Sequence, residues 1–159
     1  DIREERRRDA GGELVADLVV RAARLHGIEV PVEHVPDMID EFPILSVAAA
    51  AARGTTTIRG AAELRVKESD RIAAMANGLR ALGIAVAETP DGAAIEGGRL
   101  GGGGVDSAGD HRVAMSFAVA GLVADAPVRI ADCANVGTSF PGFVALANAA
   151  GFELRETAP

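Results

Sequence analysis

The first third of this chain changes from strand-like to helix-like spacing of its apolar residues. The charged run at 1–13 ends in a Gly-Gly pair and predicts an exposed edge or loop. The β-branched runs at 16–21 and 27–30 predict two short strands. Residues 44–52 are apolar on nearly every side of a helix, so we expect that helix to be buried all round. Arg53-Gly54 then ends it.

A second unit of the same kind follows. Residues 55–60 predict a strand, and residues 67–83 predict a helix whose apolar positions keep helical spacing until Gly83 closes it. The runs IAVAE and AAIEG flank a Pro-Asp-Gly turn and therefore predict a β-hairpin.

The last third repeats the alternation. The stretch 97–104 is glycine-rich but lacks the Gly-Lys-Ser/Thr ending of a phosphate-binding loop, so we expect a flexible surface loop. Helices are expected at 111–124 and from about Pro141 to Ala150, with strands at 128–132 and 152–156. Alternating helices and strands predict an α/β or α+β fold in which helices pack against sheet.

Composition and charge exclude several classes of function for this chain. The chain has 159 residues, which is enough for one domain, and its net charge of -7 argues against nucleic acid as the main partner. The apolar run at 44–52 is too short to cross a membrane. Cys133 is the single cysteine, so we expect a small buried side chain, no internal disulfide and a reduced, cytoplasmic setting.

Three expected helix starts carry charged residues that the apolar bodies of the helices do not explain. They are Asp40-Glu41, the run from Lys67 to Arg71, and the run from Asp110 to Arg112. Basic residues oppose the helix dipole at such positions, whereas arginine beside free amide groups makes a site for phosphate or carboxylate. Lys67 is the only lysine among sixteen basic residues, and its compact ammonium group is not interchangeable with guanidinium.

Structural interpretations of the same residues remain open. Lys67 and Arg71 are four residues apart and share a face of the expected helix, which is also typical of a solvated salt-bridge network. Asp70 and Asp110 are ordinary acids for the start of a helix, and Asp110 is also suited to cap one. Asp40 either caps the buried helix or, beside cations, stays ionised and acts as a general base.

Three longer stretches resemble the C-terminal region of EPSP synthases (3-phosphoshikimate 1-carboxyvinyltransferases). They are IDEFPILSVAAAAARGTTTIRGAAELRVKESDRIAAMANGLRALG, GDHRVAMSFAVAGL and TSFPGF. The pairing of RVKESDR with DHR about forty residues later is the specific part of the likeness. The resemblance implies repeated βαβαββ units with buried parallel helices, forming an inside-out α/β barrel. Residues 1–159 are then about two of the three units of the C-terminal domain, with the N-terminal portion absent.

The resemblance also implies an activity. The family transfers the enolpyruvyl group of phosphoenolpyruvate to the 5-hydroxyl of shikimate 3-phosphate, without a metal or organic cofactor. Because other ligands lie upstream in the family, we expect this chain to be inactive alone and to need the missing N-terminal part as its partner. The implied roles are a base for the 5-hydroxyl at Asp40, a shikimate-side ligand at Lys67, an acid for the methylene carbon at Glu68, phosphoenolpyruvate ligands at Arg71 and Arg112, and support for the latter at His111.

One departure and two alternatives accompany the resemblance. Some relatives carry a lysine where this chain has Thr138, so phosphoenolpyruvate binding differs there or another residue supplies the charge. UDP-N-acetylglucosamine enolpyruvyl transferase shares the chemistry but does not account for both motifs. A non-catalytic binding module of the same fold is the remaining alternative.

Overall fold

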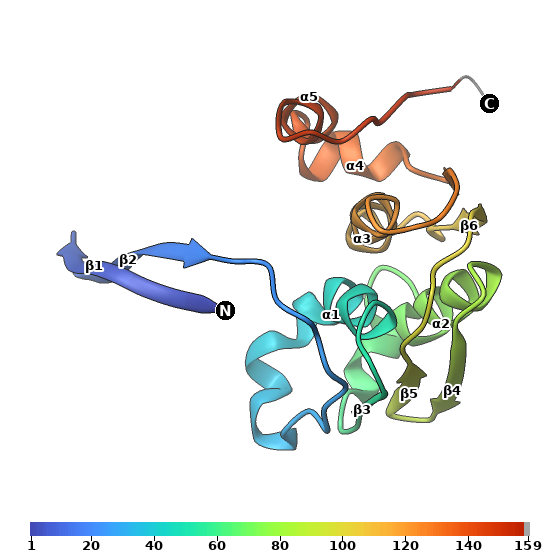
Figure 1. The fold of residues 1–159 in the computed structure, drawn as a ribbon, viewed down its shortest axis with the longest axis horizontal. Coiled ribbons are helices and arrows are strands. Elements are labelled where there is room, and N and C mark those ends of the chain that lie inside the picture. Colours follow the sequence, from blue (N-terminus) through green and yellow to red (C-terminus); the bar gives the residue numbers. More distant parts are fainter. Residues whose placement is uncertain (158–159) are drawn as a thin grey trace.

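A computed structural model describes residues 1–157 and shows an N-terminal hairpin projecting from a layered body (Figure 1). Strands β1 (Ile2–Ala10) and β2 (Glu13–Val20) pair antiparallel. Gly11 and Gly12 turn the chain with φ of 72° and 89°, a region that favours glycine. The expected strand at 16–21 is thus confirmed in longer form, and the charged run before it is an exposed strand, which agrees with the predicted exposed edge and not with the alternative of a loop.

A three-stranded antiparallel sheet forms the base of the body. Its order is β3 (Thr55–Ile58), β5 (Gly92–Glu96) and β4 (Ala85–Thr89), and the expected β4–β5 hairpin is confirmed. The strand expected at 27–30 is reduced to one isolated parallel bridge, which joins Glu29 to Thr57 of β3.

Helix α1 (Phe42–Ala50) packs against β5 on one side and against α3 (His111–Ala120) on the other. It is buried over most of its length, but Ile44 is 40% exposed, so the expected burial on every side is only partly confirmed. Helix α2 (Arg71–Ala81) packs beside it, and Gly78 of α2 seats the ring of Phe117. A Cβ atom at position 78 would lie 2.2 Å from Phe117 Cζ, so only glycine fits there.

Short 3-10 helices lead into these helices. They are η1 (Val32–His34), η2 (Pro36–Glu41) and η3 (Ala62–Val66). The helix expected from residue 67 begins only at Arg71, because Asp70 caps it. Lys67 and Arg71 therefore do not share a helix face, and that part of the prediction is wrong.

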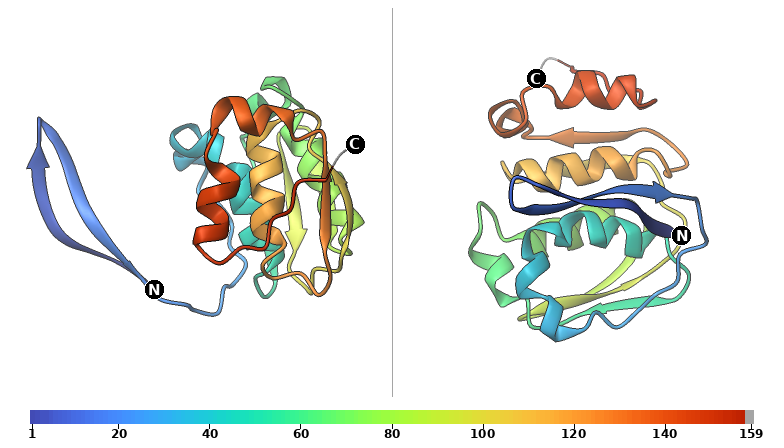
Figure 2. Two further views of the ribbon diagram at one scale, coloured as in Figure 1. Left: turned by 90° about the horizontal axis from the view of Figure 1, so that it is seen from above. Right: turned by 90° about the vertical axis from the view of Figure 1, so that its left-hand side faces the viewer.

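A parallel pair of strands lies beside α3. β6 (Gly103–Asp106) and β7 (Val128–Ala131) are joined through α3, and α4 (Ala134–Ser139) and α5 (Phe143–Ala149) cover α3 from above (Figures 1 and 2). The glycine-rich stretch is not a flexible loop, because Leu100 is buried and part of the stretch forms β6. The expected strand at 152–156 does not form, and α4 has no counterpart in the predictions.

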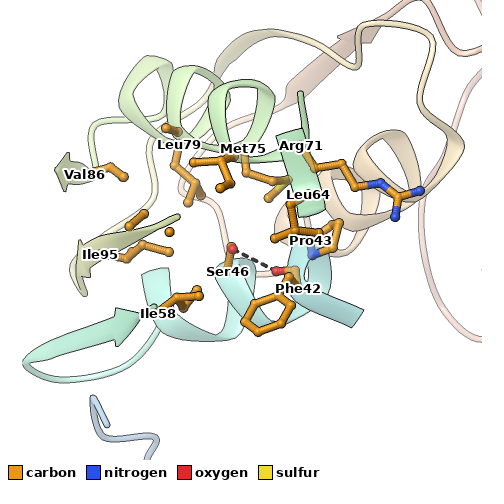
Figure 3. Close-up of a pocket in the computed structure, with 14 residues that line it drawn as sticks. Phe42, Pro43, Ser46, Ile58, Leu64, Arg71, Met75, Leu79, Val86 and Ile95 are labelled. Atoms are coloured by element: carbon orange, nitrogen blue, oxygen red, sulfur yellow. Dashed lines mark hydrogen bonds between the residues drawn. The ribbon is translucent and has the colours of Figure 1, made fainter. Parts of the chain in front are cut away.

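The core between α1, α2 and the sheet is closely filled (Figure 3). The cavity in it has a volume of about 20 Å³, enough for one water molecule and too small for a substrate. Ser46 satisfies its buried hydroxyl by donating to the Phe42 carbonyl at 2.8 Å. Cys133 is exposed, which corrects the expectation that it is buried. None of the helices within 1–157 combines the length and apolarity needed to cross a bilayer.

Candidate active site

Three segments that precede helices meet at one cluster of charged side chains. Asp40 lies at the end of η2, Glu68 lies in the turn between η3 and α2, and Asp110 caps α3. Each segment ends a turn or loop just before a helix, which brings side chains distant in sequence to the same place. The charged side chains at the three helix starts therefore lie together in the structure, as expected from the sequence.

Arg71 is the centre of the cluster. Its side chain is 2% exposed and leaves the edge of the apolar core with its guanidinium group outermost (Figure 3). Nε donates to Asp110 Oδ2 at 2.8 Å, Nη1 to Asp40 Oδ1 at 2.9 Å and Nη2 to Glu68 Oε2 at 2.6 Å. A buried guanidinium group needs such partners, because its desolvation is costly without them.

Burial and ion pairing shift the pKa values of Arg71 and Asp40 in opposite directions. Burial alone would lower the pKa of Arg71, but the hydrogen bonds and charges of Asp110, Asp40 and Glu68 raise it above its ordinary value. Burial would raise the pKa of Asp40, but the hydrogen bond from Arg71 and the charges of nearby cations lower it. Asp40 is therefore ionised at neutral pH.

Lys67 lies outside α2 and reaches the cluster from the end of η3. Its Nζ is 2.5 Å from Glu63 Oε1 and 3.8 Å from Asp40 Oδ1. The hydrogen bond with Glu63 raises the pKa of Lys67, although partial burial opposes it. The contact with Glu63, four residues earlier, was not predicted, although that spacing within a helical turn is a recognisable signal.

Arg112 approaches Asp40 from α3. Its Nη1 donates to the Asp40 carbonyl oxygen at 3.2 Å, its Nη2 lies 3.5 Å from Asp40 Oδ2, and Glu41 is 3.7 Å away. His111 is half-buried at the start of α3 and makes no side-chain hydrogen bond or ion pair with residues 1–157. Of the six predicted residues, His111 alone has no polar contact with the cluster in this part of the chain.

Asp110 has a larger part in the cluster than its sequence position suggests. It is fully buried, and its Oδ1 accepts from the backbone N–H groups of Arg112 at 2.9 Å and Val113 at 3.3 Å. Its Oδ2 accepts from Arg71 and from the Ser69 hydroxyl at 3.3 Å. Capping by Asp110 was predicted, but the ion pair with Arg71 was not.

Asp70 and Asp40 differ in capping. Asp70 caps α2 by accepting from Ala73 N at 2.9 Å, whereas the sequence predicted only an acid within the first turn of that helix. Asp40 makes no cap hydrogen bond to α1, whose N-cap position is Glu41. The capping interpretation of Asp40 is therefore wrong, and its ionised carboxylate is left beside Lys67, Arg71 and Arg112.

The arrangement places cations beside carboxylates, some of them partly exposed to solvent. Glu68 is about half exposed, with a side-chain exposure of 53%, while Arg71 lies beneath it. Lys67 and Arg112 flank Asp40 from either side. Fixed cations next to carboxylates are suited to hold an anionic substrate while a proton moves.

Sequence comparison identifies related proteins. Residues 5–146 match the family EPSP synthase (3-phosphoshikimate 1-carboxyvinyltransferase). The 3-phosphoshikimate 1-carboxyvinyltransferase of Xanthomonas campestris pv. campestris (strain 8004) is 64% identical over 154 residues, which is 97% of this chain and 35% of that protein. The enzyme of Xanthomonas oryzae pv. oryzae (strain PXO99A) is 62% identical over the same length. The chain thus spans about a third of the length of these curated relatives.

Solved structures give the same result. A structure of EPSP synthase from Acinetobacter baumannii matches with a TM-score of 0.91 and 49% identity, covering 96% of this chain and 36% of that one. A second structure of the enzyme from this organism matches with a TM-score of 0.92 and 44% identity, covering 99% and 37%. The mixed α/β class predicted from the sequence is confirmed by this likeness.

Proposed function

The chain belongs to the EPSP synthase family, and from that premise we propose that the longer enzyme carrying it makes 5-enolpyruvylshikimate 3-phosphate. That enzyme transfers the enolpyruvyl group of phosphoenolpyruvate to the 5-hydroxyl of shikimate 3-phosphate and releases phosphate. The chain spans only 35% of a relative's length, so it supplies part of the site and is inactive alone.

The observation that carries the proposal is the meeting of Asp40, Glu68 and three cations from separate segments. The segments are far apart in sequence: Arg112 lies 72 positions after Asp40, whose carbonyl oxygen it contacts. A salt-bridge network with only a structural role does not need an exposed carboxylate next to a buried arginine. This combination is what a reaction needs when an anionic substrate is both bound and protonated.

Asp40 is assigned as the base for the 5-hydroxyl, and Lys67 as a ligand near the same hydroxyl. The lowered pKa of Asp40 keeps it ionised, so it is ready to accept a proton at neutral pH. A carboxylate with a lowered pKa is a weak base, so removal of the hydroxyl proton has to accompany C–O bond formation. Lys67, 3.8 Å from Asp40, favours the developing negative charge on the hydroxyl oxygen.

Glu68 is assigned as the acid that exchanges a proton with the methylene carbon of phosphoenolpyruvate. Protonation there creates positive charge on the neighbouring carbon, which the carboxylates of Asp40 and Glu68 stabilise. Arg71 and Arg112 bind the anionic groups, and His111 supports Arg112. An arginine carries five N–H donors, and Arg71 uses three of them on carboxylates of the described chain.

The wider predictions are part of the same proposal. Residues 1–159 form about two of three βαβαββ units of an inside-out α/β barrel, and the enzyme is cytoplasmic and works without a metal or organic cofactor. Thr138 lies exposed in α4, and either another residue of the enzyme supplies the charge that some relatives place there or phosphoenolpyruvate binding differs.

The test uses the full-length enzyme with both substrates. Phosphate release is expected with shikimate 3-phosphate and phosphoenolpyruvate, and none when UDP-N-acetylglucosamine replaces the shikimate. Absence of release with the shikimate pair, or release only with the sugar nucleotide, would exclude the proposal.

The role of Glu68 has its own readout. In D₂O, the wild-type enzyme is expected to incorporate deuterium at the methylene carbon of phosphoenolpyruvate, and Glu68→Gln is expected to reduce this by roughly a hundredfold or more. Glu96→Gln, an exposed acid at the end of β5, is the matched control and should exchange at the wild-type rate. Equal exchange in both variants would show that Glu68 does not take part in the proton transfer.

A further inference from the structure

The turn between η3 and α2 lacks backbone hydrogen bonds over part of its length. It comprises residues 66–69, which include Lys67 and Glu68, and we call it the site segment. The backbone groups of Glu68 and Ser69 make no hydrogen bond to other backbone groups within the described part of the chain. Val66, at the start of the segment, is exposed. The position of the site segment therefore depends on side-chain contacts, above all at its two ends.

An ion pair joins the two ends of the site segment. Arg65, directly before the segment, donates through Nη1 to Oδ2 of Asp70, directly after it, at 2.7 Å. The side chains of Arg65 and Asp70 are 28% and 38% exposed, so solvent screens the pair only in part. The other carboxylate oxygen of Asp70 accepts from Ala73 N and caps α2. One carboxylate thus fixes both the start of the helix and the base of the segment.

Arg65 also binds the turn between β4 and β5. Its Nε donates to the Pro90 carbonyl oxygen at 2.9 Å, and its Nη2 donates to the Thr89 carbonyl oxygen at 2.7 Å. Asp91 in the same turn accepts from the backbone N–H of Gly60 at 2.8 Å, just ahead of η3. The turn therefore contacts the chain both before η3 and at its end. A guanidinium group carries donors on three nitrogens in a fixed plane, so one side chain holds all three acceptors.

Arg65 does not itself belong to the charged cluster. Within the described chain its ion-pair partners are Asp70 and Glu88, and neither is assigned a role in binding substrate. We propose that Arg65 is a positioning residue, which sets where the site segment presents Lys67 and Glu68. The proposal rests on the function proposed above, in which those two residues act on the substrates. Proton transfer needs a narrow geometry, and a displacement of about 1 Å can lower a rate about a hundredfold.

A purely structural role for Arg65 is distinguishable, because Arg80 makes the same kinds of contact at the other end of α2. Its Nε and Nη2 donate to the Val86 carbonyl oxygen at 3.1 and 2.9 Å, and its Nη1 donates to Glu88 Oε1 at 2.8 Å. Both arginines thus join α2, or the turn before it, to β4, which lies against the helix (Figure 1). Only Arg65 does so beside the site segment. Arg80→Ala is therefore the matched control.

Kinetics of the full-length enzyme give the first measurement. Arg65→Ala is expected to lower kcat about thirtyfold, and deuterium incorporation at the methylene carbon of phosphoenolpyruvate by a similar factor, because Glu68 is displaced. Arg80→Ala should stay within about twofold of the wild type in both measurements, since its contacts lie away from the site segment. Arg65→Lys keeps the charge but not the planar donor set, so it should recover only part of the lost kcat. Equal kcat values for Arg65→Ala and Arg80→Ala would overturn the proposal.

Asp70→Asn tests the ion pair itself. Asparagine keeps an acceptor for the Ala73 amide, so α2 stays capped while the charge facing Arg65 is lost. We expect kcat to fall about tenfold, and the double variant with Arg65→Ala to be no slower than Arg65→Ala alone, since both changes remove the same contact. Losses that multiply in the double variant would show that Arg65 does not act through Asp70. If Arg65→Ala does not fold, a wild-type kcat in Asp70→Asn overturns the proposal instead.

Cleavage by a lysine-specific protease gives a measurement that does not depend on the reaction. Lys67 is the only lysine in these 159 residues, so cleavage after it is identified by the masses of the products. In the native full-length enzyme, Arg65→Ala is expected to raise the rate of this cleavage about tenfold or more, because the site segment opens more often, whereas Arg80→Ala should not change it.

The two measurements separate this proposal from the proposed function. An unchanged cleavage rate in Arg65→Ala would overturn the positioning role even if kcat falls, because the loss of activity would then not arise from the position of the site segment. If the wild-type enzyme does not act on shikimate 3-phosphate, the proposed function fails, and the cleavage rates alone decide whether Arg65 holds the segment in place.

Discussion

Replacement of Asp110 by alanine removes two interactions at once. The substitution takes the cap from α3 and the partner from Nε of the buried Arg71. Loss of a cap costs about 1 kcal/mol. Breaking a buried ion pair costs about 3–5 kcal/mol, and the low end applies because Asp40 and Glu68 still hold Arg71. We therefore expect the free energy of unfolding to fall by about 4 kcal/mol.

Asp70 is a matched control on the neighbouring helix. It also caps a helix and also pairs with an arginine, Arg65 at 2.7 Å, but its side chain is 38% exposed. Asp70→Ala is therefore expected to cost about 1–2 kcal/mol, since a solvent-screened ion pair contributes at most about 1 kcal/mol. Asp110→Asn keeps an acceptor for the α3 amides and loses mainly the charge, so we expect an intermediate cost of about 2–3 kcal/mol.

Urea unfolding followed by circular dichroism measures these differences, since the sequence has neither Trp nor Tyr for fluorescence. The order Asp110→Ala, Asp110→Asn, Asp70→Ala, from most to least destabilised, is the expected result. An Asp110→Ala variant no less stable than Asp70→Ala would refute the reasoning, because it would mean that the buried pair with Arg71 contributes nothing beyond the cap.

Three further predictions follow from the same contacts. Burial alone would raise the pKa of Asp110, but the hydrogen bond and charge of Arg71 and the backbone N–H groups of Val113 and Arg112 lower it below its ordinary value. The stabilising effect of Asp110 is therefore present above the unfolded-state pKa and is lost as pH falls through the folded-state pKa. The unfolding free energy of the wild type should therefore drop more steeply than that of Asp110→Asn between about pH 5 and 3 in urea titrations. Gly78→Ala should cost about 1–2 kcal/mol in the same assay, since the clash with the buried Phe117 ring outweighs the gain in helix propensity, and a cost below that of the exposed Asn77→Ala would contradict it. Lys67→Arg in the full-length enzyme should lower kcat/KM for shikimate 3-phosphate roughly tenfold or more, and unchanged kinetics would show that any cation suffices.

Local features of the fold were predictable from short stretches of sequence. The apolar run that becomes α1, the Pro-Asp-Gly turn between β4 and β5, and the capping of α3 by Asp110 depend on neighbours within a few residues. The predictions failed where contacts between residues distant in sequence determine the local structure. The glycine-rich stretch is ordered because Leu100 is buried and because Gly102 packs against Ala126, neither of which the local composition indicates.

The sequence by itself determined which charged residues stand at the starts of helices, and the motifs RVKESDR and DHR identified the family resemblance. Only the tertiary structure decided how those residues pair. Arg71 contacts Asp40 and Asp110 across 31 and 39 residues of chain, and Lys67 turns back to Glu63 instead of sharing a face with Arg71. An ion pair depends on distances in space, and these are set by packing of the whole body and not by the spacing of residues along it.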